Sequence, residues 1–112
     1  MTRVSITTFT FNRPSFLTRT IESILSQTFE DFEYIIIDNG SIDDTQSILE
    51  EYKKRDRRIS VVTRLKNDVS TDLFIHLQMI LKARSTSYCM HVDDDDYMET
   101  TALKTLYRLI TE

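Results

Sequence analysis

An unbroken apolar run, Tyr34 to Ile37, is followed directly by the turn-forming residues 38–41. A strand that is buried on both faces of a parallel sheet has this composition, whereas a strand with one solvent face alternates apolar and polar residues. Comparable short runs lie at 4–9, 59–63 and 88–92. Because parallel strands need long crossover connections, which are usually helices, this run predicts an α/β fold.

The segments between these runs have the residue spacing of helices. The first, 14–27, opens on a proline, which suits the first helical position because its missing N–H costs nothing there. Ser41 and Asp44 resemble a capping box that opens a second helix. Segments 72–84 and 101–111 predict two further helices. Core-facing positions are expected at Leu17, Ile21, Ile24, Leu25, Ile48, Leu49, Tyr52, Leu103, Leu106, Tyr107 and Ile110.

The predicted order is therefore βαβαβαβα, in a single domain that covers residues 1–112. Such an order gives a three-layer α/β/α arrangement with a mostly parallel central sheet. Polar clusters at 10–12, 38–41, 64–68 and 93–96 each follow the carboxyl end of a predicted strand. In a parallel sheet these ends lie along one edge, where open α/β sheets bind ligands. We therefore expect the four clusters to converge.

Composition and charge narrow the class of protein. With 112 residues, of which 40% are hydrophobic and 29% charged, the chain can form one globular domain. The net charge of −4 argues against nucleic-acid binding through phosphates. The chain has no transmembrane-length apolar run and no signal-peptide apolar region. The single cysteine, Cys89, is expected to be a small buried side chain in a reducing compartment, so we predict a cytoplasmic protein, either free or peripheral at the inner membrane face.

Glycine is scarce, and Gly40 is the only one. The phosphate-binding loop of P-loop proteins and the dinucleotide-binding fingerprint both need several glycines, because the backbone must approach the phosphates closely. Both motifs are therefore excluded. If this chain binds a nucleotide diphosphate, the simplest remaining solution is a metal ion held by carboxylates.

Four consecutive carboxylates, Asp93 to Asp96, follow the last apolar run. Two unit charges about 4 Å apart repel each other by roughly 4 kcal/mol at an effective dielectric constant of about 20. A bound divalent cation offsets that cost, and Mg²⁺ usually takes one or two carboxylates together with water and substrate phosphate. Asp95 is the leading candidate ligand, with Asp93 beside it, because alternate residues in a turn can point the same way. The alternative is a solvated acidic turn without a metal.

Other polar residues at the same edge have two interpretations each. Asp38 either accepts hydrogen bonds from a base or ribose or serves as a turn former, and Asn12 either caps the first helix or contacts a ligand. Arg64 and Lys66 are candidates for phosphate contact, with a solvated loop as the alternative. His91 is expected to be a packed histidine at the edge of the core.

Several stretches resemble family-2 inverting glycosyltransferases. The similarity includes Phe11-Asn12-Arg13, the segment from Ser23 to Glu33 (SILSQTFEDFE), and the element DNGSIDDT at 38–45. The segment VDDDDYMETTAL, which begins at Val92, resembles the metal motif of that family. The resemblance covers essentially the whole chain.

The resemblance implies a GT-A-type, Rossmann-like nucleotide-diphospho-sugar transferase fold and a role in polysaccharide biosynthesis. It implies that Mn²⁺ or Mg²⁺ bridges the diphosphate of a nucleotide-sugar donor, with a UDP-sugar favoured, and that a saccharide or lipid-linked acceptor hydroxyl attacks the sugar with inversion. The residues expected at the donor site are Thr8, Thr10, Asn12, Asp38, Asn39, Asp93 and Asp94, and those expected at the metal are Asp95 and Asp93.

The chain also departs from the family pattern. Phe9 stands where the family has Pro or Thr, Asn39 where it often has Asp, and Thr100 where it has Pro. The family's phosphate-contacting arginine is missing from 76–80, and Arg64 or Lys66 are candidates to compensate.

The catalytic base of the family lies downstream of the metal motif, so the chain is expected to be an apparently truncated donor-binding half. Two other hypotheses are a non-catalytic nucleotide-binding or assembly module on the same fold and a phosphoacceptor receiver domain. The receiver domain fits poorly, because its acidic pair should follow the first strand, where Thr10 and Asn12 stand.

Overall fold

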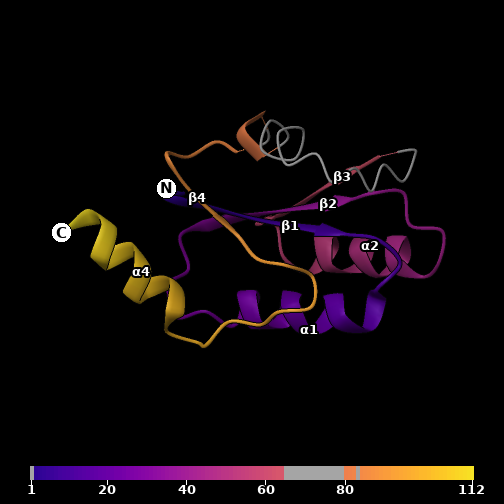
Figure 1. Cartoon of the computed structure of the whole chain (residues 1–112), viewed down its shortest axis with the longest axis horizontal. Helices are drawn as coiled ribbons and strands as arrows, with labels where there is room; N and C mark the ends of the chain where they lie inside the picture. Colours follow the sequence, from indigo (N-terminus) through magenta and orange to yellow (C-terminus); the bar gives the residue numbers. More distant parts are fainter. Residues whose placement is uncertain (1, 65–79, 83) are drawn as a thin grey trace.

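The computed structural model of the chain describes residues 2–64, 80–82 and 84–112. Strands and helices alternate through most of this part (Figure 1), and the helix expected at 72–84 lies largely outside it. The elements are β1 (Val4–Thr10), α1 (Pro14–Leu25), β2 (Phe32–Asp38), α2 (Thr45–Arg55), β3 (Ile59–Thr63), β4 (Tyr88–His91) and α4 (Ala102–Thr111).

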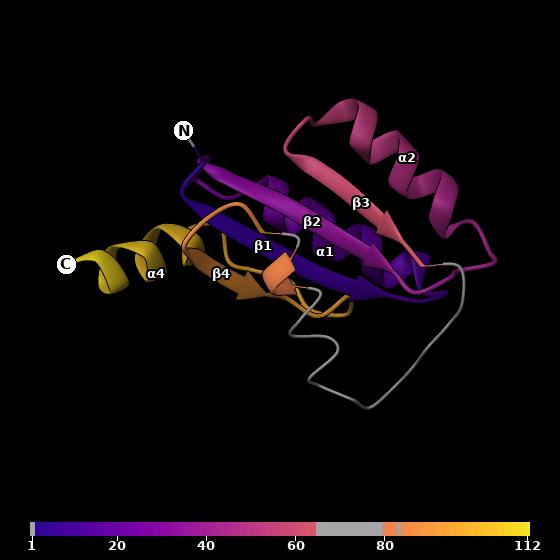
Figure 2. The same cartoon turned by 90° about the horizontal axis from the view of Figure 1, so that it is seen from above.

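The four strands form one parallel sheet in the order β3-β2-β1-β4 (Figure 2). In the register, Val4 of β1 lies opposite Phe32 of β2 and Tyr88 of β4. Helices α1 and α2 cover one face of the sheet, and the helical residues 80–82 lie over the opposite face (Figure 1). The predicted α/β class with a parallel sheet is confirmed.

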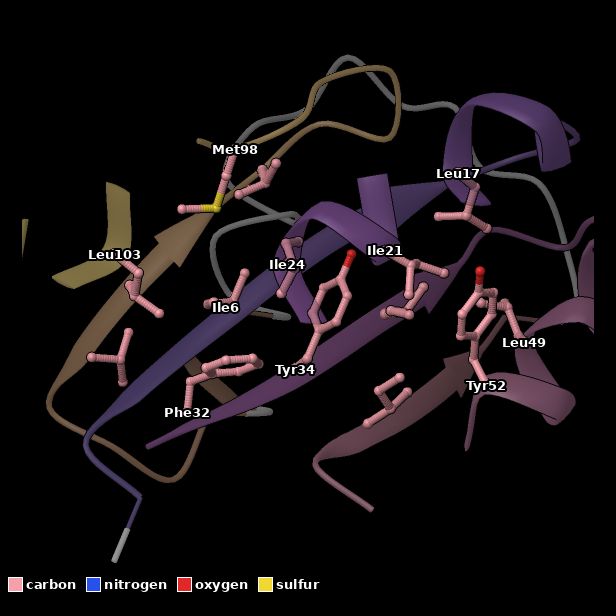
Figure 3. Close-up of a cluster of buried hydrophobic side chains, with 14 residues drawn as sticks. Ile6, Leu17, Ile21, Ile24, Phe32, Tyr34, Leu49, Tyr52, Met98 and Leu103 are labelled. Carbon is pink, nitrogen blue, oxygen red and sulfur yellow. The ribbon is translucent and has the colours of Figure 1, made fainter. Parts of the chain in front are cut away.

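Strand β2 is buried on both faces, as its apolar run predicts. Tyr34 and Ile36 belong to the main hydrophobic cluster, whereas Ile35 and Ile37 are buried outside it. Successive side chains of a strand point to opposite faces, so the strand contributes to both sides of the sheet. The main cluster fills the space between the sheet and helices α1 and α2 (Figure 3). Its helical members include Leu17, Ile21, Ile24, Leu49, Tyr52 and Leu103.

The capping box expected at the start of α2 is not present. The helix begins at Thr45, and its N-cap residue Asp44 makes no side-chain capping hydrogen bond. Instead, the Thr45 N–H donates to Oδ1 of Asp43 at 3.0 Å, and the Ser41 hydroxyl accepts a hydrogen bond from the N–H of Asn12 in the loop after β1. Helix α1 begins at Pro14 as expected but ends at Leu25, two residues before the predicted end.

Two expected core positions in α4 prove to be exposed. Leu106 and Ile110 of α4 are 43% and 55% exposed, because α4 extends away from the sheet and buries mainly Leu103 (Figure 1). Tyr107 is partly buried and packs on Phe29, with ring centroids 4.8 Å apart. Cys89 is exposed because β4 is the edge strand of the described sheet.

Among the helices in the described part of the chain, none combines the length and apolar character needed to cross a bilayer.

Candidate functional site

The carboxyl ends of the parallel strands meet at one edge of the sheet. Thr10 pairs with Asp38, and Asp38 pairs with Thr63 on its other side. The Val92 N–H donates to the carbonyl of Thr7 at 2.9 Å, so the chain leaves β4 alongside β1. The loops at 10–12, 38–41 and 93–96 therefore converge as predicted. In the remaining polar cluster, 64–68, Arg64 follows β3 at the same edge, while Lys66 lies outside the described residues.

Asn12 ties the loop after β1 to the loop after β2. Its φ of 50° is in the left-handed region, which asparagine tolerates better than most residues. The Asn12 N–H donates to Oγ of Ser41 at 3.0 Å, and its Oδ1 accepts from the N–H of Ile42 at 2.9 Å. The expectation that Asn12 caps α1 is wrong, since Arg13 occupies the N-cap position.

Asp38 is fully buried at the end of β2. Its Oδ1 accepts from the N–H of Ser41 at 3.0 Å, whereas its Oδ2 has no hydrogen-bond partner among the described residues. An unsatisfied buried acceptor costs about 1–3 kcal/mol, so Asp38 retains acceptor capacity for a ligand or a water. Asn39 is 7% exposed, and Nη1 of Arg64 lies 3.5 Å from its Oδ1.

Thr8 lies inside β1, two residues before the end of the strand. It is fully buried in β1, and its Oγ1 accepts a hydrogen bond from the Tyr34 hydroxyl at 2.8 Å. Burial raises the pKa of Tyr34 well above its ordinary value, so the phenol remains a hydrogen-bond donor. Thr8 thus supports the strand beneath the site.

In the acidic loop, three carboxylates converge and the fourth turns inward. Asp93, Asp95 and Asp96 are exposed, and each offers a carboxylate oxygen within 4.8 Å of the others. The Asp94 side chain is only 11% exposed and accepts hydrogen bonds from Oγ1 of Thr10 at 3.0 Å and from Nη1 of Arg13 at 3.2 Å. This geometry matches the expected convergence of Asp93 and Asp95.

Three exposed carboxylates this close together fit a hard divalent cation. Oxygen ligands are those that Mg²⁺ and Mn²⁺ prefer, and an open cluster leaves positions for water and phosphate. His91 adjoins the cluster, with Nε2 3.2 Å from Oδ1 of Asp93 and Nδ1 3.1 Å from Oγ1 of Thr7. His91 is exposed on the edge strand rather than packed at the edge of the core, although its ring centroid lies 5.3 Å from that of Phe9.

Polar side chains of α1 hold the backbone of the acidic loop. Oγ1 of Thr20 donates to the carbonyl of Asp94 at 3.0 Å and also contacts the carbonyl of Asp96. The hydroxyl of Ser23 accepts from the N–H of Met98 at 3.0 Å. Thr20 and Ser23 are one helical turn apart, so the loop lies along one face of the helix.

Gln27, just beyond the end of α1, continues this row of hydrogen bonds. Its Nε2 donates to the carbonyl of Glu99 at 2.7 Å, and its Oε1 accepts from the N–H of Leu103 at 3.0 Å. The first N–H groups of a helix have no partner within that helix. Gln27 therefore caps α4 from another element, while the α4 N-cap residue Thr101 makes no side-chain capping bond.

Sequence reasoning did not assign a role to Arg13, Thr20, Ser23, Gln27 or Asp96. The polar residues of α1 recur at helical spacing between buried apolar ones, and this pattern is a readable signal for a second, polar contact face. Arg13 carried no such signal, because its partner Asp94 is 81 positions away in the sequence.

Comparison with known proteins identifies the family. The model of "Glycosyl transferase family 2" matches residues 5–112. The chain belongs to glycosyl transferase family 2. It is 33% identical over 112 residues to the GalNAc(5)-diNAcBac-PP-undecaprenol beta-1,3-glucosyltransferase of Campylobacter jejuni. It is 35% identical over 103 residues, or 92% of the chain, to the Escherichia coli glucosyltransferase WfaP, which uses UDP-Glc according to its name. The chain spans 36% and 39% of the lengths of these family-2 relatives.

Solved structures of transferases confirm the GT-A fold. Staphylococcus aureus TarS 1–349 in complex with UDP-GlcNAc superposes with a TM-score of 0.83 and 25% identity over 96% of the chain, which corresponds to 31% of that protein. The mannosyltransferase PcManGT of Pyrobaculum calidifontis, solved with GDP-Man and Mn²⁺, has a TM-score of 0.85 at 16% identity. The match covers 98% of the chain and 32% of that enzyme, and at this identity it supports the fold alone.

Proposed function

We propose that this chain is the donor-binding half of an inverting glycosyltransferase. In this proposal, Asp93 and Asp95 hold a divalent cation, Mn²⁺ or Mg²⁺, and that cation binds the diphosphate of a nucleotide-sugar donor. The observation that carries the proposal is the convergence of the exposed carboxylates of Asp93, Asp95 and Asp96 at the carboxyl edge of a family-2 sheet. The cation would supply Lewis-acid stabilisation of the departing nucleotide diphosphate.

The chain's own residues would bind and orient the nucleoside at the same edge. Asp38 offers the unsatisfied Oδ2 as an acceptor, and Asn39 offers an amide beside it. Thr10 and Asp94 bind each other, so we infer that they fix the floor of the site beneath the donor. An acceptor hydroxyl would then attack the anomeric carbon from the face opposite the leaving group. The base that removes its proton is expected outside this chain.

The donor class is proposed from the relatives. WfaP is named for UDP-Glc, and TarS was solved with UDP and with UDP-GlcNAc, which favours a UDP-sugar here. The cluster of exposed carboxylates suits Mn²⁺ as well as Mg²⁺, and we propose Mn²⁺ as the first metal to test. The name of the Campylobacter relative favours a lipid-linked saccharide as the acceptor.

Calorimetric titration of the chain with UDP, GDP, CDP and dTDP, with and without MnCl₂, tests this proposal. We expect at least one nucleotide to bind only when Mn²⁺ is present, and we expect Asp95→Asn to weaken that binding at least about ten-fold because a charged ligand is lost. Asp31→Asn makes the same chemical change at an exposed position before β2 and should bind as the wild type does. Equal heats for wild type and Asp95→Asn would remove Asp95 from the site.

A further inference from the structure

The acidic loop has a built-in counter-ion, Arg13. We propose that Arg13 is a positioning residue: by binding Asp94 it turns that carboxylate inward and thereby orients Asp93 and Asp95 outward together. The consequence for cation binding rests on the function proposed above, whereas the effect on the loop does not.

The contacts of Asp94 show why it needs a charged partner. Its side chain is 11% exposed, and it accepts hydrogen bonds from Thr10 at 3.0 Å and Arg13 at 3.2 Å. A carboxylate that is withdrawn from water is stable only when paired and hydrogen-bonded. Thr10 supplies a neutral donor, so within the described contacts the compensating charge comes from Arg13.

The backbone around Arg13 is constrained on both sides. Asn12 holds a left-handed conformation that its hydrogen bonds with Ser41 and Ile42 fix in place. Pro14 follows, and a residue before proline is excluded from much of the helical region. The backbone at Arg13 is therefore held in place by its neighbours. Little further backbone entropy is lost when its guanidinium binds the acidic loop.

Arg13 also lies close to the proposed metal ligand Asp95. Its Nη1 is 3.6 Å from Oδ2 of Asp95, and both side chains are 51% exposed. Charge repulsion between Arg13 and a bound cation opposes the benefit of positioning. Because exposed pairs are weak and a buried unpaired carboxylate is costly, we expect the Asp94 contact to dominate.

Two properties of a matched set of variants test the proposal. The set is Arg13→Gln, Arg13→Lys, Asp94→Asn and the double variant Arg13→Gln/Asp94→Asn. Arg55→Gln is the control, since Arg55 forms an exposed ion pair with Glu22 on the helices. The first property is hydrogen exchange of the loop amides in metal-free protein, in particular the Asp96 N–H that donates to the carbonyl of Asp93 at 3.1 Å. The second is the dissociation constant for Mn²⁺ alone, measured from the paramagnetic resonance of the free ion.

In Arg13→Gln we expect the Asp96 amide to exchange about ten-fold faster and Mn²⁺ to bind about three- to ten-fold more weakly, since a shielded carboxylate loses its counter-charge. Arg13→Lys should recover part of both effects. Adding Asp94→Asn to Arg13→Gln should restore Mn²⁺ affinity to within about two-fold of wild type, because a neutral amide needs no counter-ion. A residue with a purely structural role would instead lower the melting temperature without this rescue.

Different outcomes separate the two claims. Unchanged exchange of the loop amides in Arg13→Gln overturns the positioning role whether or not a metal binds. Tighter Mn²⁺ binding by Arg13→Gln also overturns it, because Arg13 would then act mainly by repelling the cation. If wild type fails to bind Mn²⁺ while the loop amides still respond to Arg13→Gln, the proposed function fails and the positioning role stands.

Discussion

The contact of Gln27 with the segment that follows the acidic loop gives the sharpest prediction. Gln27→Leu keeps a similar volume but removes the acceptor of the buried Leu103 N–H and the donor to the Glu99 carbonyl. Leaving a buried backbone group unsatisfied costs about 1–3 kcal/mol, so the two losses together predict a decrease of roughly 2–4 kcal/mol in the free energy of unfolding. That is a large share of the roughly 5–15 kcal/mol typical of a domain.

Urea denaturation measures this loss. With a urea dependence of about 2 kcal/mol per molar, the midpoint should fall by roughly 1–2 M. Gln46→Leu is the matched control, because Gln46 is exposed and, among the described residues, its side chain makes one hydrogen bond, to the carbonyl of Ser41 at 3.0 Å. This change should cost under about 1 kcal/mol. Hydrogen exchange of the Leu103 amide should also accelerate. A loss no larger than that of the control, together with unchanged exchange at Leu103, would refute the assignment of Gln27 as the cap of α4.

Two further predictions concern stability. Tyr34→Phe removes the phenol that donates to Thr8 at 2.8 Å inside the core, and we expect thermal or urea unfolding to show a loss of about 1–1.5 kcal/mol; no loss would mean that the buried bond is compensated elsewhere. Arg58 binds Asp56 through Nη2 at 2.8 Å and Nε at 3.1 Å, and this contact lowers the pKa of Asp56 below its ordinary 3.8. Because the pKa of Asp56 is lower in the folded state, this contact stabilises the fold at pH values above the pKa of Asp56 in the unfolded chain, and the stabilisation is lost as the pH falls through the pKa of Asp56 in the folded protein. Arg58→Ala should therefore cost about 0.5–1 kcal/mol at pH 7 and progressively less below pH 3.8. A cost that stays constant down to pH 2 would contradict that origin.

The regular elements could be predicted because local spacing determines them. The run at 34–37 predicted a strand buried on both faces, and β3 spans the predicted residues 59–63. The start of α2 was predicted wrongly because two local hydrogen-bonding patterns compete there: Asp43 rather than Ser41 receives the first N–H of the helix. The Ser41 hydroxyl instead accepts a hydrogen bond from the N–H of Asn12, which is distant in sequence.

Exposure near the C-terminus could not be read from spacing. The pattern of Leu106 and Ile110 correctly indicates one apolar face of α4, but it contains no information on whether another element covers that face. The exposure of Cys89 could not be predicted for a related reason, since the sequence does not show which strand lies at the edge of the sheet.

The candidate site was predicted only in part. The order of charged residues along the acidic loop indicated that Asp93 and Asp95 converge, and the structure agrees. The pairing of Asp94 with Arg13 depends on tertiary structure, so no local rule predicts it.

The sheet order has a consequence for the order of folding. Val4 pairs with residues 28 and 84 positions away, in β2 and β4 respectively. Closing the longer loop costs about 1 kcal/mol more chain entropy than closing the shorter one. We therefore expect β1, α1 and β2 to assemble early and β4 to dock late, which means that the edge carrying the acidic loop forms only after the hydrophobic interior. A nascent or partly denatured chain would then retain a structured N-terminal unit while lacking the carboxylate arrangement that we propose for cation binding.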